Sequence, residues 1–295
     1  MPALVSGTAQ CLHVGSLDVA TTAGALSQLA GVLAGFAFFA VIFVLTSTAT
    51  GERRPYGWAL ALADYDEALL TLFCATFGLA ITAIQYAIIA GERNPGLHYG
   101  RAASEELMAD ISLSLSIFLL VAGMLWLIVP VFGSTQRVVR VLASVGGPPM
   151  AVYFIAETAR EVAVGAWATK SGLILCGSNS FYSAVLLWGH TVAPLLTLGV
   201  ASSFWLVPRF LSPAQRRALE GVAARGRIAI PVATLVGIAV AVAGGVSFDE
   251  FHPHSHLGEG WVWVALAATA LIVLAHAFLL RFRPKAPAQL ALPGT

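Results

Sequence analysis

The sequence predicts an all-α membrane protein with seven transmembrane helices, its N-terminus outside and its C-terminus in the cytoplasm. The first observation is composition: 58% of the 295 residues are hydrophobic and only 11% are charged, whereas soluble domains carry about 25% charged residues. The second is the length of the apolar runs, since a helix needs about 20 mostly apolar residues to cross a bilayer core about 30 Å thick. The third is the way the basic residues alternate along the chain. The length of the uninterrupted runs excludes a transmembrane barrel.

Seven windows meet the length requirement. In chain order they are residues 25–47, 67–90, 108–132, 139–160, 181–207, 226–247 and 260–281. They define an extracellular N-terminal segment at 1–24, a seven-helix transmembrane domain at 25–283 and a short cytoplasmic tail at 284–295. The first 24 residues contain no Lys or Arg and no continuous apolar run, so they do not resemble a cleavable signal peptide.

Two windows contain small residues at the spacing that lets helices pack closely. Gly31 and Gly35 form a GxxxG pair in the first window. Small residues also recur at every fourth position of the sixth window, namely Ala233, Gly237, Ala241 and Gly245. We expect both seams to pack within the monomer, and a homodimer through either of them is the alternative.

The fourth window and the connection after the fifth are irregular. Gly146-Gly147-Pro148-Pro149 falls near the middle of the fourth window, and proline removes a backbone donor and clashes with the preceding turn, so we expect a kink or a broken helix there. The connection SPAQRRALEGVAARGR predicts a short surface helix, with Ser212 as N-cap, Pro213 in the first helical position and Gln215 completing a capping box.

Basic residues predict the orientation. With the N-terminus outside, twelve of the sixteen Lys and Arg residues lie on the cytoplasmic side, where short basic loops are preferentially retained. Five of them lie in or beside the predicted surface helix: Arg209, Arg216, Arg217, Arg225 and Arg227. We expect these to contact anionic lipid headgroups, at about 1 kcal/mol each. They serve mainly as topology determinants, and a regulatory or partner-docking surface is the alternative.

Five ionisable residues predict a polar pocket in the outer half of the membrane. Asp110 lies in the first turn of the third window, Glu157, Arg160 and Glu161 end the fourth, and His190 lies nine residues into the fifth. Such groups cost about 2.5–3.5 kcal/mol each on insertion scales, so each is a candidate for function. We expect them to line one outward-facing pocket that binds or conducts a small cation, a proton or a compact polar ligand.

Structural explanations stay open for the same positions. The set at 157–161 could be a hydrated helix end of little energetic weight. His190 could be hydrogen-bonded to a backbone carbonyl or to a hydroxyl such as Thr191. Gln85 and Tyr86 lie at similar depth near the outer end of the second window, and His276 lies in the inner half of the seventh without an obvious acidic partner.

The segment FDEFHPHSHLGEG, at 248–260, is rich in histidine. His252, His254 and His256 alternate, so an extended strand would point all three the same way, and neutral imidazole is a good ligand for Zn or Cu. The pattern matches no HExxH-type signature. A divalent metal site is therefore one prediction, and a solvated loop whose histidines become charged below neutral pH is the other.

The cysteines predict one disulfide. Cys11 and Cys176 both fall on the predicted outer side, where disulfides persist, while Cys74 lies in the second window. A bridge between them would tie the N-terminal segment to the connection between the fourth and fifth windows.

Several function classes lack their motifs. The seventh window has no lysine to hold a retinal, and there is no P-loop, GxSxG elbow or CxxCH haem attachment. No strongly basic domain points to nucleic acid. We expect a multi-pass plasma-membrane protein, transporter-like or channel-like, in contact with membrane lipids. The alternatives are an intramembrane enzyme using carboxylic-acid general acid/base chemistry on a lipid or isoprenoid, and a structural or sensory subunit of a membrane complex or homo-oligomer.

Overall fold

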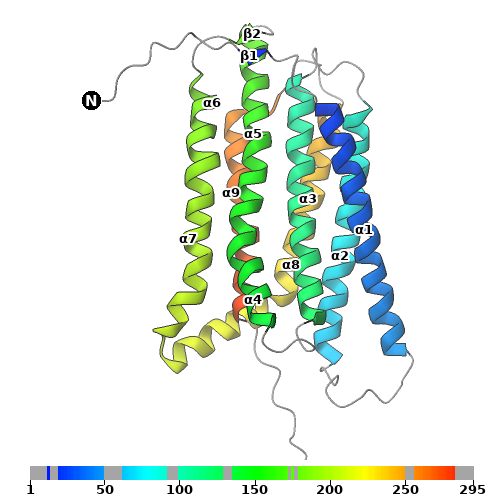
Figure 1. Ribbon diagram of the computed structural model, residues 1–295, viewed down its shortest axis with the longest axis vertical. Coiled ribbons are helices and arrows are strands. Elements are labelled where there is room, and N and C mark those ends of the chain that lie inside the picture. Colours follow the sequence, from blue (N-terminus) through cyan, green and yellow to red (C-terminus); the bar gives the residue numbers. More distant parts are fainter. Residues whose placement is uncertain are drawn as a thin grey trace, which may run out of the picture.

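The computed structural model describes residues 12–13, 19–49, 62–91, 99–128, 135–171, 174–175, 179–249 and 256–282. Within these residues seven helical spans are long and apolar enough to cross a membrane, and they run side by side as one bundle (Figure 1). The all-helical, seven-span class predicted from the sequence is therefore confirmed. The orientation of the two termini relative to a membrane stays a prediction.

The spans are longer than the hydrophobic windows. The first three spans are single helices, α1 (Val19–Ala49), α2 (Leu62–Ala90) and α3 (Tyr99–Ile128). The fourth span joins α4 (Thr135–Val141), the π-helical segment η2 (Leu142–Gly146) and α5 (Gly147–Ser171). The fifth joins α6 (Ser180–Ala184), the π-helical segment η3 (Val185–Val192), α7 (Ala193–Leu206) and the 3₁₀ turn η4 (Val207–Arg209). The last two are α8 (Pro213–Asp249) and α9 (Glu259–Phe282).

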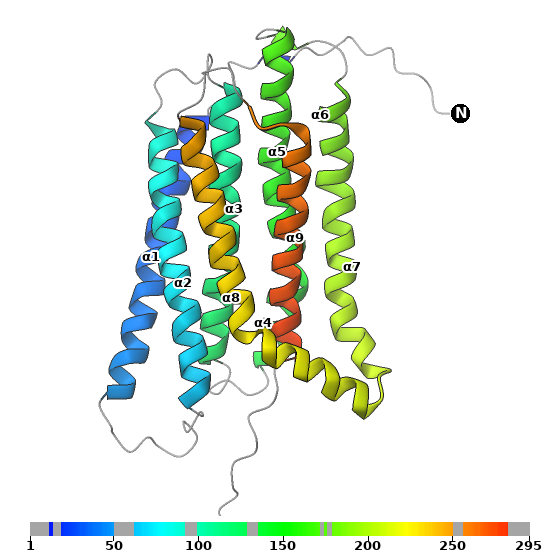
Figure 2. The same cartoon turned by 180° about the vertical axis from the view of Figure 1, so that it is seen from behind.

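The two ends of the bundle differ. At one end, which we call the β end, β1 (Leu12–His13) pairs antiparallel with β2 (Ile174–Leu175), as seen at the top of Figure 1. At the other, which we call the arginine end, η4 and the first part of α8 carry Arg209, Arg216 and Arg217. Because the number of spans is odd, α1 starts at the β end and α9 finishes at the arginine end (Figure 2).

α3 is the central helix. It packs against α1, α2, α5, α8 and α9, and 78% of its apolar window is buried, the largest share among the described spans. Its polar residues are therefore inside the protein and need partners there. Thr82 of α2 and Ser112 of α3 supply one such contact, with their hydroxyls 2.6 Å apart.

The two seams of small residues have different outcomes. α1 packs on α2 through alanines spaced seven residues apart, Ala23, Ala30 and Ala37, all fully buried. Gly31 and Gly35 lie on the exposed side, where an added Cβ would meet no atom within 4 Å. The expectation that this GxxxG pair packs within the monomer is therefore wrong, because alanines on another face of α1 make the contact.

The sixth span behaves as expected over most of its length. Gly237 approaches Leu115 and Ile272, Ala241 is buried, and Gly245 faces Gln85. Ala233 is exposed. The seam therefore lets α8 approach α2 and α3 closely.

The predicted surface helix is present but is continuous with the sixth span. The amide of Ser212 donates to Gln215 Oε1 at 3.0 Å and the amide of Gln215 donates to Ser212 Oγ at 3.3 Å, which confirms the capping box. α8 begins at Pro213 and first runs across the arginine end before it turns along the bundle (Figure 2).

Arg227 does not point to a headgroup in this arrangement. Its guanidinium donates to Glu67 Oε1 of α2 at 2.9 Å. Arg209, Arg216, Arg217 and Arg225 are exposed, and their contact with anionic lipid stays a prediction.

The fourth span is helical through its double proline. Instead of a break, the five residues of η2 adopt the wider π geometry directly before Gly147. Pro148 and Pro149 lack the amide hydrogens that would bond to the preceding turn, and a π segment accommodates the missing bonds without opening the helix. Of the kink or break expected from the sequence, the structure shows no break, and the irregularity appears as a change of helical register in η2.

Candidate functional site

The site is built around Asp110, the most deeply buried carboxylate of α3. Its side chain is 1% exposed. Tyr86 of α2 donates a hydrogen bond to Asp110 Oδ1, and Thr158 of α5 donates one to Oδ2. Both oxygens thus have a donor from a neighbouring helix, which offsets part of the cost of burying the group. Asp110 therefore links α2, α3 and α5.

Two further carboxyl groups meet one turn from Asp110, toward the β end. The carboxyl groups of Glu106 of α3 and Glu161 of α5 lie against each other. Glu106 is 3% exposed, and its Oε2 has no hydrogen-bond partner among the described residues. Two ionised carboxylates in contact repel each other, and a proton shared between them or a bound cation would relieve that repulsion. This carboxyl pair is therefore a candidate site for a proton or a cation.

A second set of polar side chains, those of Glu157, Arg160 and His190, lies beside the carboxyl pair. Arg160 donates to Glu157 Oε1, and His190 Nε2 lies 2.7 Å from Glu157 Oε2. Arg160 also lies beside Tyr182 of α6. The ring of Tyr153 meets that of His190 edge-on, with centroids 5.3 Å apart. Glu157 thus connects α5 to the fifth span.

Local helix geometry explains how these side chains meet. On α3 the pair Glu106 and Asp110, and on α5 the pair Glu157 and Glu161, are four residues apart, which places each pair on one helical face. His190 lies inside the eight-residue segment η3, and Pro194 follows it on α7. π segments are frequent at functional positions, because the inserted residue turns a side chain out of the regular α-helical register.

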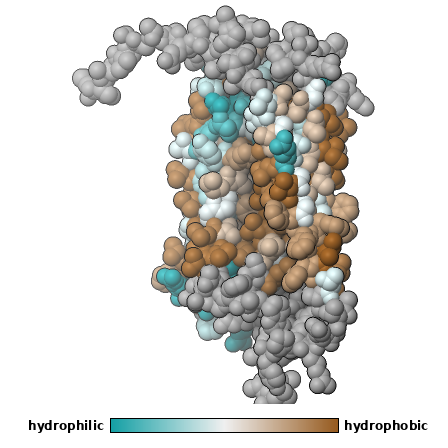
Figure 3. All heavy atoms as spheres, turned by 45° about the vertical axis from the view of Figure 1, so that its right-hand side comes forward, coloured by the Kyte–Doolittle hydropathy of each residue, from teal (hydrophilic) through white to brown (hydrophobic). Residues whose placement is uncertain are grey.

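Exposure increases from the inside to the outside of the cluster. Asp110 and Glu106 are buried, whereas the side chain of Glu157 is 44% exposed and that of Arg160 is 31% exposed. Figure 3 shows one face of the bundle as a broad hydrophobic belt with a hydrophilic area near its upper end. The carboxyl pair is therefore buried, whereas the neighbouring contact of Glu157 with Arg160 is partly exposed.

The cluster lies deep in the spans. Asp110 is eleven residues into α3, about 16 Å along the axis at 1.5 Å per residue. α5 continues ten residues past Glu161, to Ser171. The fourth span does not end at 160, so the expectation of a helix end at 157–161 is wrong, whereas the depth of these residues in a membrane stays a prediction.

All five residues predicted from the sequence belong to this cluster, although they do not all touch. Asp110 reaches α5 through Thr158, and His190 reaches it through Glu157. Glu106 and Thr158 were not expected. Glu106 was missed because the hydrophobic window of the third span starts at 108, whereas the helix starts at Tyr99.

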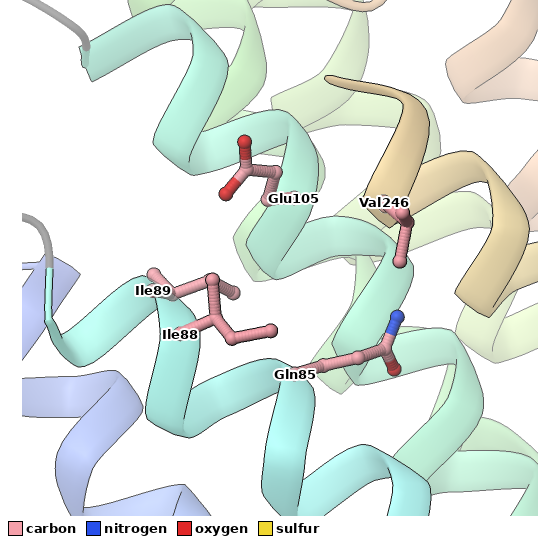
Figure 4. A pocket seen from close by; sticks show the side chains of 6 residues that line it. Gln85, Ile88, Ile89, Glu105 and Val246 are labelled. Atoms are coloured by element: carbon pink, nitrogen blue, oxygen red, sulfur yellow. The ribbon is translucent and has the colours of Figure 1, made fainter. Parts of the chain in front are cut away.

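A smaller polar site lies on another side of α3. Gln85 is 7% exposed, and neither atom of its amide group has a hydrogen-bond partner among the described residues. A cavity of about 20 Å³ separates it from Glu105, enough for about one water molecule. Figure 4 shows Gln85 extending from α2 toward Val246 of α8, with Glu105 nearby on α3. Glu105 also pairs with Arg101 at 3.5 Å, so this site is separate from the carboxyl pair.

His276 lies apart from both sites. Its Nε2 is 2.8 Å from Thr234 Oγ1, and its ring stacks on Phe118 with centroids 6.4 Å apart. It is 1% exposed, so the hydroxyl of Thr234 supplies the partner that the sequence did not reveal.

The predicted metal site and disulfide fall largely outside the described residues. His252, His254, Cys11 and Cys176 belong to the segments that the structure does not describe. His256 is half-buried, with its Cβ against the first turn of α3 at Gly100. Among the described residues no group of three or more His, Cys, Asp or Glu is placed to hold a metal ion, and Zn or Cu binding at 252–256 stays a prediction.

Comparison of the chain with protein-family models, with curated proteins and with solved structures finds no match.

Proposed function

We propose that this protein is a transporter-like or channel-like membrane protein that binds and releases a proton or a small cation at the carboxyl cluster. The cluster consists of Asp110, Glu106 and Glu161, with Glu157, Arg160 and His190 as its exposed side. The observation that carries the proposal is that two buried carboxyl groups, those of Glu106 and Glu161, lie against each other inside the spans.

The carboxyl pair is suited to reversible binding. With one proton shared between Glu106 and Glu161, the pair carries a single negative charge. The third carboxyl group of the cluster, Asp110, makes the loss of that proton costly because it would add a further negative charge nearby. A cation entering the pair would neutralise the same charges, so proton and cation compete for one site. Buried carboxylates inside membrane spans typically mark ion pathways or proton relays for this reason.

Glu157 and its two partners supply a route to the surface. Glu157 is half-exposed and contacts both Arg160 and His190. His190 Nε2 lies 2.7 Å from Glu157 Oε2, so a proton can pass between the two groups. The guanidinium of Arg160 keeps a fixed positive charge beside the carboxylates, which offsets their mutual repulsion.

Flux into vesicles tests the proposal. Purified protein is reconstituted into proteoliposomes that contain a pH-sensitive dye, and a proton or sodium gradient is applied. Glu106→Gln and Glu161→Gln remove one acid each and are expected to abolish most of the flux. Glu220→Gln is the matched control, because Glu220 lies near the arginine end of the bundle on the surface part of α8.

Infrared difference spectroscopy gives a second readout. A shared proton produces a protonated-carboxyl carbonyl band that should shift on acidification and disappear in Glu106→Gln. If sodium alters the band at constant pH, the ligand includes a cation; if only pH alters it, the ligand is a proton. Wild-type vesicles without flux, together with a band insensitive to both, would reject the proposal in favour of an enzyme or a complex subunit.

A further inference from the structure

A second cavity lies between α3 and α5, on the arginine-end side of the carboxyl cluster. Its volume is about 340 Å³, within the range of about 300–1,000 Å³ that is usual for small-molecule sites. The lining is apolar except for one hydroxyl, that of Ser114, and its largest side chains are Phe118, Met150 and Phe154. Met150 is 70% exposed, so the cavity opens to the side of the bundle.

Helical spacing places this cavity next to the buried contact between Asp110 and Thr158. On α3, Ser114 follows Asp110 by four residues and Phe118 follows by eight. On α5, Phe154 precedes Thr158 by four residues. Residues at these spacings share one helical face, and the hydrogen bond between Asp110 and Thr158 joins the two faces at the head of the cavity. The buried polar contact therefore lies one helical turn from Ser114, and the rest of the cavity lining is apolar.

Gly147 allows the ring of Phe118 to approach α5 closely. A Cβ at this position would lie 2.8 Å from that ring. Any side chain at 147 would therefore displace Phe118. Ala143 and Ala151 also line the cavity, and such small residues leave room for a chain rather than filling the space themselves.

The position of the cavity restricts its occupant. Ser114 is the sixteenth residue of the span Tyr99–Leu127 and therefore lies near its middle, where charged headgroups do not enter. The molecules available at that depth are lipids. A lipid whose polar end is at Ser114 must have a small head, and the nearby carboxylate of Asp110 disfavours a negative charge on it.

We propose that this cavity binds a single-chain lipid with a compact, uncharged, oxygen-bearing head. The head lies at Ser114, one turn from Asp110, and the hydrocarbon chain lies against Phe118, Met150 and Phe154. This inference goes beyond ion binding and does not depend on it, since it concerns a separate ligand and a separate measurement.

Photolabelling in lipid nanodiscs tests the site. The probe is a long-chain alcohol with a diazirine in its chain and a terminal alkyne, and phosphatidylcholine with the same diazirine chain is the comparison. Peptides that cover 114–121 and 147–154 are expected to take up the alcohol in preference to the phospholipid. Ala151→Phe fills the cavity and should lower this labelling several-fold. Ala267→Phe, in a lipid-facing groove between η3, α7 and α9, is the matched control and should leave it unchanged.

Two further variants keep the result decisive. Ala143→Phe fills the cavity from its other side if Ala151→Phe does not fold, as judged by a monodisperse elution profile and thermal unfolding. Ser114→Ala should reduce labelling by the alcohol more than labelling by the phospholipid. Equal labelling of all lipid-facing helices, or labelling that neither filling variant changes, would overturn the proposal. Stronger labelling by the phospholipid would show an ordinary acyl chain and overturn it as well.

Discussion

Tyr86 and Thr158 donate hydrogen bonds to opposite oxygens of the same buried carboxylate, Asp110, from helices on either side of it. Tyr86 is fully buried and Thr158 is 6% exposed. The three side chains thus form a bridge across α2, α3 and α5 that is closed to solvent. A bridge of this kind stabilises the bundle and holds Asp110 in one orientation.

Thr158→Val should therefore destabilise the protein. The substitution keeps the shape of the side chain and removes the donor, so one oxygen of Asp110 loses its partner at a cost of about 1–3 kcal/mol. Thr197→Val is the control, since the buried hydroxyl of Thr197 bonds only to carbonyls of its own helix in the described structure. Thermal unfolding in detergent measures both. Equal losses for the two variants would contradict a special role for the bridge.

The number of spans could be predicted from the sequence because it depends on one-dimensional quantities. Hydrophobic length and the spacing of charges decide how often a chain crosses a bilayer. The ends of the spans could not be predicted in this way. Helices continue past the hydrophobic core, so the turns that hold Glu106 and Glu161 were assigned to loops or helix ends.

The contacts within the site depend on which helical faces meet, and that information is three-dimensional. The sequence predicts one pocket for Asp110, Glu157 and His190 but not which of these side chains touch. In the structure Thr158 of α5, and not Glu157, donates a hydrogen bond to Asp110. His190 reaches Glu157 from a π segment. The hydrophobic pattern of the fifth window does not predict where that change of helical register occurs. The ionisable residues could therefore be identified, whereas their pairing could not.

If the carboxyl cluster binds and releases ions as proposed, Glu157→Gln should slow ion movement without removing the proton shared by Glu106 and Glu161. The neutral side chain loses the ionic contact with Arg160 and weakens the contact with His190, while Glu106 and Glu161 keep theirs. Vesicle flux should fall several-fold, and the infrared band of the protonated carboxyl should persist. Loss of the band along with the flux would mean that Glu157 belongs to the binding site itself and not to its access route.

Gly165→Ala should separate α5 from α3. An added Cβ would lie 2.7 Å from the Cα of Gly100, and neither backbone can move away without disturbing the helix pair. Overpacking of this kind costs about 1–3 kcal/mol. Gly31→Ala is the matched control, because an added Cβ there meets nothing within 4 Å. Its helix-favouring effect should leave stability equal or slightly higher. Unfolding in detergent distinguishes the two, and equal stability of both variants would be evidence against close α3–α5 contact.

A disulfide between Cys11 and Cys176 is the last prediction, and the neighbouring strands support it. The antiparallel register pairs Leu12 with Leu175 and His13 with Ile174. Leu12 and Leu175 are the chain neighbours of Cys11 and Cys176, so the described strands bring the two segments together beside the cysteines, which themselves lie outside the described residues. Opposed residues in an antiparallel pair have Cα atoms about 4.5 or 5.5 Å apart, within the range of about 4.4–6.8 Å that a disulfide spans.

Mass spectrometry of unreduced protein checks the bridge. Digestion should yield one linked peptide that contains both cysteines and separates into two on reduction. Cys11→Ser should abolish the linked species, and it should lower thermal stability only under non-reducing conditions, because the bridge acts mainly by restricting the unfolded chain. Cys74→Ser, at a buried cysteine that is free, serves as the control and should leave the linked peptide intact. Free thiols at both 11 and 176 in protein kept under air would contradict the prediction.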